Sequence, residues 1–420
     1  MSLLLACLAD DFTGATDALE SLTLAGLQTV MFAEAPSPEA VAAISGLQAI
    51  VVASAARSWT LEETERVRPI LTALRELRPR HVVYKVCSTF DSSPQRGSIG
   101  RVIEIGAEVF SQTTIPVVPG APTLGRYLVF GNLFAAGSIA SGGDVYRLDR
   151  HPVMSRHPVT PMLESDLRRH LSLQTDRAIG LFDVRDLSLP PAERRRAWDA
   201  AAKDHAIFLC DLLTADQQAT LGELLDGSAD GHAPRFSVGS SGATSSLGAH
   251  WNATGVCTPR TAWPPVSPQA PILVVSGSCS AVTGRQIVAA FAAGWVGVDA
   301  LSESAVTDAA RALQSGKHAI LHTSIGPHDP RRTTGLPEMG TRLGEMASEI
   351  LANVPTLRRL IFAGGDTSSY ALAQLGIKTF QMIARITPGA PLCDGDGLEI
   401  VCKGGQAGTD DFFLLAAGES

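Results

Sequence analysis

What the sequence lacks excludes several classes of protein. It has no apolar segment near the ~20 residues needed to span a bilayer, and no basic stretch of the kind that begins a signal peptide. The net charge is −8 and no aromatic-rich basic stripe occurs, so nucleic acid is not an expected partner. The seven cysteines form no CxxC pair, which disfavours a zinc ribbon or a disulfide scaffold. These absences, with an apolar fraction of 45%, predict a compact cytoplasmic protein of enzyme size.

Short apolar runs of strand length alternate with longer segments of helical periodicity along most of the chain. The run "LLLACLA" precedes a small-residue helix from about Gly14 to Ala25, and the strand-like "HVVYKVC" follows the amphipathic "VRPILTALREL". Such alternation favours parallel sheets covered by helices. We therefore expect an α/β fold of two domains, each a largely parallel or mixed sheet flanked by helices, with a cleft between them.

The alternation fails once, in "WNATGVCTPRTAWPPVSPQAP", which holds five prolines and no periodicity. This is the composition of an interdomain linker. We place a larger domain at residues 1–252, the linker at 253–269 and a smaller domain at 270–420, with a β-rich ending in "LEIVCKGGQAGTDDFFLLA". In open α/β sheets ligands bind outside the carboxyl ends of the strands, so residues at strand exits are the candidates for function.

Three strand exits in the smaller domain are rich in small residues. They are "SGSCS", "AGGDTSS" and "KGGQAG", which contain Ser278, Gly364, Gly365, Asp366, Thr367, Lys403, Gly404 and Gly405. Glycines let backbone N–H groups approach a phosphate, and a helix N-terminus adds partial positive charge. Each turn alone is also typical of an ordinary capped helix, but three together favour an anion site. The patterns GxxxxGK[ST] and GxGxxG are absent at strand exits, which disfavours P-loop enzymes and nicotinamide-dependent dehydrogenases.

Polar residues also follow strands in the larger domain. Asp10 and Asp11 end the first apolar run, Arg57 lies in "ASAARSW", and Lys85 begins "KVCSTFDSS". A guanidinium binds a carboxylate bidentately and hydroxyl side chains bind hydroxyl groups, so this set suits a small polyhydroxy carboxylic acid. A solvated loop is the alternative, and it is weaker for Lys85, which follows the apolar "HVV".

Several of these motifs together resemble those of the four-carbon acid sugar kinase family. In chain order they are "LADDFTGATDAL", "ARSW", "YKVCSTFDSS", "HPVTPM", "GSCS", "FAGGDTS" and "KGG". The resemblance covers essentially the whole chain. It implies two α/β domains, of which residues 1–252 bind the acid sugar and residues 270–420 bind the nucleotide. It also implies transfer of the γ-phosphoryl group of ATP, with Mg²⁺, to the C4 hydroxyl of a tetronate.

The resemblance assigns roles to single residues. The acid-sugar site comprises Asp10, Asp11, Arg57, Lys85, Cys87, Ser88 and Thr89. The nucleotide site comprises Ser278, Gly364, Gly365, Asp366, Thr367, Lys403, Gly404 and Gly405, and Asp366 is a candidate for holding magnesium or its waters. Phosphoryl transfer needs positioning and charge neutralisation, so we expect Asp11 or Asp10 to accept the C4 hydroxyl proton. Arg57 and Lys85 are expected to hold the substrate carboxylate.

The resemblance leaves the substrate open. The wording "CSTFDS" is closer to the 3-oxo-tetronate branch, but Gly97-Ser98-Ile99-Gly100 departs from the usual GNIG, so D-threonate and D-erythronate remain alternatives. A hydrolase or isomerase of phosphorylated sugar acids, or a ligand-binding sensor, would use the same residues without turning over ATP. The expected partners are a small acid sugar and ATP, with no nucleic acid and no membrane, and a homo-oligomer is left open.

Overall fold

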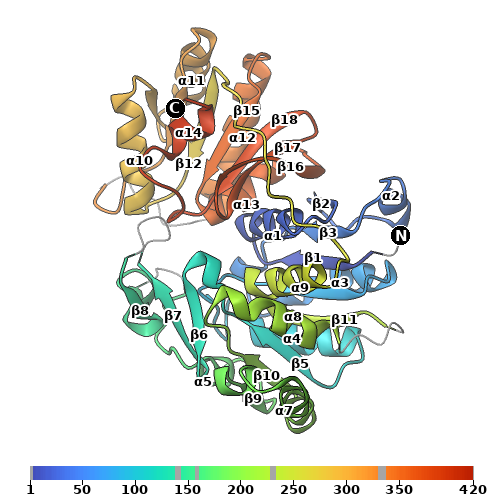
Figure 1. Ribbon diagram of the computed structural model, residues 1–420. Coiled ribbons are helices and arrows are strands. Elements are labelled where there is room, and N and C mark those ends of the chain that lie inside the picture. The colour runs from blue at the N-terminus through green and yellow to red at the C-terminus, as the bar shows by residue number, and fades with distance from the viewer. Residues whose placement is uncertain (1–2, 138–142, 157–159, 228–232, 330–336, 420) are drawn as a thin grey trace. The chain divides into compact units, whose positions relative to one another are not determined.

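The structure is a computed structural model that describes residues 3–137, 143–156, 160–227, 233–329 and 337–419. Its contacts divide the chain into two compact units (Figure 1). Unit 1 consists of Met1–Asp10 and Ser21–Thr261, and unit 2 consists of Asp11–Glu20 and Ala262–Ser420. Among the described helices, none has both the length and the apolar character that a membrane span requires.

Unit 1 is built on a parallel sheet with strand order β2-β3-β1-β4-β11-β5-β10-β9. Its strands are β1 (Leu5–Ala9), β2 (Thr29–Phe32), β3 (Ala49–Val52), β4 (His81–Lys85), β5 (Ile115–Val118), β9 (Ile179–Phe182), β10 (Ile207–Cys210) and β11 (Arg235–Gly239). Every residue of β1, β3 and β4 is buried, as expected for parallel strands covered on both faces. The helices in this part of the chain are α1 (Phe12–Leu24), α2 (Pro38–Ala42), α3 (Val67–Glu76), α4 (Ile99–Val109), α5 (Leu167–Leu171), α6 (Val184–Leu187), α7 (Pro191–Asp204), α8 (Gln218–Asp226) and α9 (Ser241–Ala253).

A small antiparallel sheet is inserted in unit 1 after β5. It consists of β6 (Arg126–Val129), β7 (Asn132–Ala136) and β8 (Val145–Arg147), paired in that order. A 3₁₀ turn over Pro122–Leu124 leads into β6, and isolated bridges join Leu128 to Leu212 and Ala121 to Arg126. These bridges tie the insertion to the loops that leave the carboxyl ends of β5 and β10.

Unit 2 contains a mixed sheet with strand order β13-β14-β12-β15-β18-β17-β16. The first five strands in this order are parallel, and β17 and β16 are added antiparallel. The strands are β12 (Ile272–Ser276), β13 (Val296–Asp299), β14 (Ala319–His322), β15 (Arg359–Ala363), β16 (Thr379–Thr387), β17 (Ala390–Gly395) and β18 (Leu398–Lys403). The helices are α10 (Ala281–Ala292), α11 (Ala305–Gln314), α12 (Pro337–Asn353), α13 (Gly365–Ala373) and α14 (Phe412–Ala417).

Both units use the same strand order around their first strand. In unit 1 the order is β2-β3-β1-β4, and in unit 2 it is β13-β14-β12-β15. In each unit the second and third strands of the chain lie on one side of the first strand, and the fourth strand lies on its other side. Ligands of open α/β sheets bind outside the carboxyl ends of strands where the order reverses in this way. Ligand binding is therefore expected at the exits of β1 and β4 in unit 1, and at the exits of β12 and β15 in unit 2.

The α/β fold expected from the sequence is confirmed, but the expected β-rich ending is wrong after Lys403. The apolar run at the end of the chain forms helix α14 instead of a strand. Phe412, Phe413, Ala416 and Ala417 are buried at i, i+1, i+4, i+5 spacing, which places them on one helical face. Periodicity alone does not separate strand from helix in so short a run.

Unit 2 includes Asp11–Glu20, which form most of α1. The backbone N–H of Phe12 donates to Ser369 Oγ at 3.1 Å, and its ring meets Phe380 edge-on with 6.1 Å between centroids. At the other end of this segment, the Gly389 N–H donates to the Glu20 carboxylate at 2.6 Å. These contacts join residues more than 350 positions apart in the chain, so local sequence pattern does not predict them.

Candidate active site

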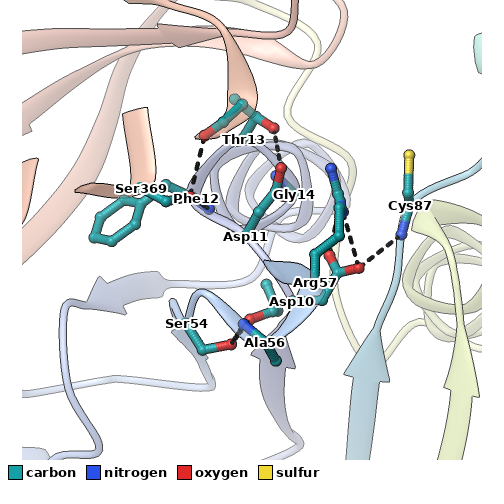
Figure 2. A network of polar contacts seen from close by, with 12 residues as sticks. Asp10, Asp11, Phe12, Thr13, Gly14, Ser54, Ala56, Arg57, Cys87 and Ser369 are labelled. Atoms are coloured by element: carbon teal, nitrogen blue, oxygen red, sulfur yellow. Dashed lines mark hydrogen bonds and ion pairs between the residues drawn. The ribbon is translucent and has the colours of Figure 1, made fainter. Parts of the chain in front are cut away.

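Asp10 follows β1 directly, is buried, and forms an ion pair with the partly buried Arg57. The Arg57 guanidinium donates to both carboxylate oxygens, with Nη2–Oδ1 at 2.8 Å and Nε–Oδ2 at 3.2 Å. The Cys87 N–H also donates to Asp10 Oδ2 at 3.4 Å (Figure 2). Because β3, β1 and β4 are neighbours in the sheet, their three exits meet at this carboxylate. From the sequence we expect Arg57 to hold the substrate carboxylate. In the structure its guanidinium binds the carboxylate of Asp10.

Asp11 points to the start of α1. Its Oδ1 accepts the Gly14 N–H at 2.6 Å, and its Oδ2 accepts the Thr13 hydroxyl at 2.7 Å (Figure 2). An aspartate that accepts a backbone N–H three residues on is a helix N-cap. Asp10 and Asp11 are both 2% exposed. The two adjacent aspartates thus differ in at least one partner: Asp10 binds the Arg57 guanidinium, and Asp11 binds the first turn of α1.

The exit of β4 carries the remaining acid-sugar candidates. Lys85, the last residue of β4, is 2% exposed, and its carbonyl accepts the Asp10 N–H at 2.9 Å. Cys87 Sγ lies 2.9 Å from Thr89 Oγ1, and Ser88 is half-buried in the turn between them. Burial raises the pKa of the Cys87 thiol, so this side chain acts as a neutral hydrogen-bonding group and not as a thiolate nucleophile.

In unit 2, the three glycine-rich turns predicted from the sequence converge. The adjacent parallel strands β12, β15 and β18 end at the same edge of the sheet. A methyl group added at Gly405 would lie 3.0 Å from Ser278 Oγ, and one added at Gly277 would lie 2.3 Å from Thr367 Oγ1. At Gly364, with φ +117°, an added methyl group would lie 3.0 Å from Thr367 Oγ1 and 3.5 Å from the Ser278 backbone nitrogen. Only glycine permits so close an approach of the three turns.

Ser280, the last residue of the predicted "SGSCS" turn, belongs to this arrangement, and so does Thr283, which was not singled out from the sequence. Ser280 caps α10 by accepting the Val282 N–H at 3.2 Å, and Thr283 Oγ1 donates to the Gly405 carbonyl at 3.0 Å. A serine immediately before a helical pattern is a recognisable cap signal, and Ser280 fits it. Thr283 has no such local signal, since its partner lies 122 residues away.

Lys403 lies beneath the third turn and is fully buried. Its ammonium donates to Thr283 Oγ1 at 3.0 Å and lies 5.6 Å from the centroid of the Phe412 ring. The resulting chain from Lys403 through Thr283 to the Gly405 carbonyl supports the turn from inside the unit. Burial lowers the pKa of Lys403 to about 7. The lysine of the "KGG" motif is thus placed to hold the loop.

The depressed pKa of Lys403 predicts a pH dependence of stability. The unfolded lysine binds a proton up to about pH 10.5, but the folded one releases it near pH 7, so stability rises with pH across this window. The wild type should gain up to about 1.4 kcal/mol per pH unit there relative to Lys403→Met. Urea unfolding of both proteins between about pH 7 and about pH 10 measures this difference. The exposed Lys378→Met is the control and should show no such trend; a constant difference for Lys403→Met would contradict the buried, neutralised lysine.

The residues at the three turns fit a nucleotide phosphate. Gly404 has open space where a side chain would stand, Ser278 and Ser280 bring hydroxyl groups, and α10 begins beside them. The side chain of Asp366 lies outside the described part of the structure. Elsewhere in the described ranges, no group of three histidine, cysteine or carboxylate side chains has the geometry to bind a metal ion. A magnesium ion bound chiefly by phosphate oxygens and water needs no such group.

Comparison with known proteins identifies both units. Two family models match the chain, a sugar-binding N-terminal domain over residues 5–247 and a nucleotide-binding C-terminal domain over residues 273–413. The chain is 40% identical to a 3-oxo-isoapionate kinase from Paraburkholderia graminis, covering 98% of this chain and 93% of the relative. It is 32% identical to a 3-oxo-tetronate kinase from Cupriavidus necator, covering 98% and 95%. The chain belongs to the four-carbon acid sugar kinase family.

Solved structures show that this acid sugar kinase has the fold of known proteins. A Salmonella typhimurium LT2 protein that carries a tRNA synthase label matches it with a TM-score of 0.76 at 25% identity, over 99% of each chain. The Haemophilus influenzae protein HI1011 matches with a TM-score of 0.72 at 24% identity, over 98% of this chain and 99% of that one. With the kinase names of the relatives, the family assignment confirms the predicted class of enzyme, a phosphotransferase that acts on a sugar acid.

Proposed function

We propose that this acid sugar kinase transfers the γ-phosphoryl group of ATP to the terminal C4 hydroxyl of a 3-oxo sugar acid. A 3-oxo-tetronate is the first candidate, and 3-oxo-isoapionate is the second. The observation that carries the substrate class is the agreement among the relatives: the 40% identical protein and those at 30–32% identity are all named for 3-oxo acids. The sequence motif "CSTFDS" in the turn after β4 supports the same substrate class.

The proposed chemistry needs a proton acceptor beside the substrate hydroxyl. Asp11 is our candidate because it lies at the start of α1 beside Asp10, and because proton uptake by Asp10 would remove one charge of its ion pair with Arg57. In the reaction the C4 oxygen forms a bond to the γ-phosphorus, its proton passes to Asp11, and the bond from that phosphorus to ADP breaks. Asp10 and Arg57 would position the turn after β4 and the substrate bound to it.

The nucleotide phosphates would lie against the three turns of unit 2. Backbone N–H groups near Gly364 and Gly404 and the hydroxyl groups of Ser278 and Ser280 would donate to phosphate oxygens. Magnesium bound with ATP would neutralise charge on the transferred group. Lys403 would act from within the unit by holding Thr283 and, through it, the 403–408 turn.

A panel of sugar acids tests this proposal. Purified protein is given Mg-ATP with a 3-oxo-tetronate, 3-oxo-isoapionate, D-threonate or D-erythronate, and ADP is measured by a coupled assay. We expect kcat/KM for at least one 3-oxo acid to exceed those of both simple hydroxy acids by about 10²-fold or more, because a site built to bond the oxo group rejects its reduced analogue. Preference for D-threonate or D-erythronate would overturn the substrate class, and absence of ADP with every acid would overturn the kinase assignment.

A further inference from the structure

Unit 1 contains a buried guanidinium, that of Arg126, which has not been named among the candidate site residues so far. Arg126 is the first residue of β6 and is 8% exposed. Its Nη1 donates to the carbonyl oxygens of Leu124 at 3.0 Å, Gly125 at 3.3 Å and Ala136 at 3.4 Å. Its Nε is buried with no hydrogen-bond partner among the described residues. The protein thus fixes this guanidinium through neutral carbonyl groups on one side.

Arg126 also lacks a counter-charge in the described part of the chain. No carboxylate there is within ion-pair distance of its guanidinium, and Asp91 is the carboxylate whose charge acts on it. Burial lowers the pKa of Arg126. A buried cation without an anion beside it is unfavourable, and arginine stays protonated in proteins. The arrangement is stable with a small anion bound and is costly without one.

Asp91 is a second buried charged group with an unused atom in the same region. It is 6% exposed, and its Oδ1 has no hydrogen-bond partner among the described residues. Its charge acts on Arg126, on the Cys87 thiol and on His170. Asp91 and Arg126 are therefore close enough to interact electrostatically but do not pair. A ligand with both an anionic group and hydroxyl groups would satisfy both.

Cys87 connects this pair with Asp10. Its N–H donates to Asp10 Oδ2, and the charges of Asp91, Arg57 and Asp10 act on the pKa of its thiol. The turn after β4 therefore contacts the Asp10–Arg57 ion pair and lies within electrostatic reach of Asp91 and Arg126. Arg57 is already bound bidentately to Asp10, whereas Arg126 Nε has no hydrogen-bond partner among the described residues.

We infer that Arg126 binds the carboxylate of the sugar acid and that Asp91 accepts a hydrogen bond from one of its hydroxyl groups. This inference rests on the proposed function and names the carboxylate subsite within it. It replaces Arg57 in that role, so that Arg57 positions Asp10. The substrate then lies along the turn after β4, with its carboxylate at the start of β6 and its terminal hydroxyl toward the aspartates that follow β1.

The test compares the acid substrate with its uncharged carboxamide analogue. In the wild type we expect kcat/KM for the acid to exceed that for the amide by about 100-fold or more, since a charge-assisted bidentate contact is lost. In Arg126→Gln and Arg126→Met the KM for the acid should rise by about 100-fold, the preference for the acid should largely vanish, and the KM for ATP should stay unchanged. Arg147→Met is the matched control: Arg147 lies in β8 of the same small sheet but pairs with Asp149 at the surface.

A crystal structure of the wild-type protein with the sugar acid bound does not depend on a variant folding. We expect a carboxylate oxygen about 2.9 Å from Arg126 Nε. A carboxylate bound by Arg57 or Lys85 instead, or a full acid preference in Arg126→Gln, would overturn the inference. The two proposals fail separately. If the acid binds at Arg126 but no ADP forms, the kinase function fails and the subsite stands; if ADP forms and Arg126→Gln keeps its preference, the subsite fails alone.

Discussion

Asparagine in place of Asp11 is expected to lower kcat by about 10²–10⁴-fold and to leave the affinity for ATP unchanged. Asparagine cannot take up the C4 hydroxyl proton, but it caps helices as well as aspartate does. The Gly14 N–H therefore keeps its acceptor and α1 should form normally. Steady-state kinetics with the preferred acid, together with calorimetric titration of ATP, separates the loss of chemistry from a loss of nucleotide binding.

Two further variants make the Asp11 result decisive. Asp17→Asn removes the same charge from the partly exposed middle of α1 and should change kcat by no more than about twofold. Asp10→Asn breaks the ion pair with Arg57, and we expect chiefly a higher KM for the acid because the turn after β4 loses its anchor. If Asp11→Asn is fully active and Asp10→Asn is not, Asp10 is the base; if both are fully active, neither is.

Alanine in place of Gly364 is expected to lower kcat/KM for ATP by about 100-fold, because displacements near 1 Å in a positioned site have effects of this size. Gly364 has φ +117°, which L side chains rarely adopt, and an added methyl group would lie 3.0 Å from Thr367 Oγ1. The turn after β15 must shift, and with it the close approach to Ser278. The affinity for the sugar acid, measured by thermal shift without nucleotide, should not change.

Gly376→Ala is the matched control for Gly364→Ala. Gly376 lies beyond the other end of α13, has φ +67°, and has no atom within 4 Å of an added methyl group. Both substitutions strain the backbone of the same unit, but only Gly364 adjoins the three turns. We expect both variants to lose stability and only Gly364→Ala to lose ATP binding. Equal loss of ATP binding would indicate damage to the whole unit, and unchanged binding in Gly364→Ala would place the nucleotide elsewhere.

The sequence predicted the parts of this protein that follow local rules. Alternating apolar runs and helical periods gave the α/β class, and glycine-rich turns marked the exits of β12, β15 and β18, which the strand order brings together. The aspartates after the first run were recognised as candidates because charge at the exit of a buried strand needs an explanation. Each of these signals lies within about ten residues of chain.

Other features depend on strand order, which a single sequence does not reveal. The pairing of Asp10 with Arg57 requires β3 beside β1, and the N–H of Cys87 reaches the same carboxylate because β4 lies on the other side. The burial of Lys403 against Thr283 and Phe412 also depends on the fold, since both partners lie outside its motif. No local pattern in the sequence marks Arg126. Its distinguishing feature is a buried guanidinium that has no ion-pair partner among the described residues.

Transfer of labelled phosphate is the most direct test of the central claim. ATP labelled in its γ-phosphate is incubated with the protein, magnesium and a 3-oxo-tetronate or 3-oxo-isoapionate, and the products are separated. The account predicts that the label appears in a C4 phosphate ester of the acid, in equal amount to the ADP released. Label found only as inorganic phosphate, or ATP left intact while the acid raises the Tm of the protein, would contradict it.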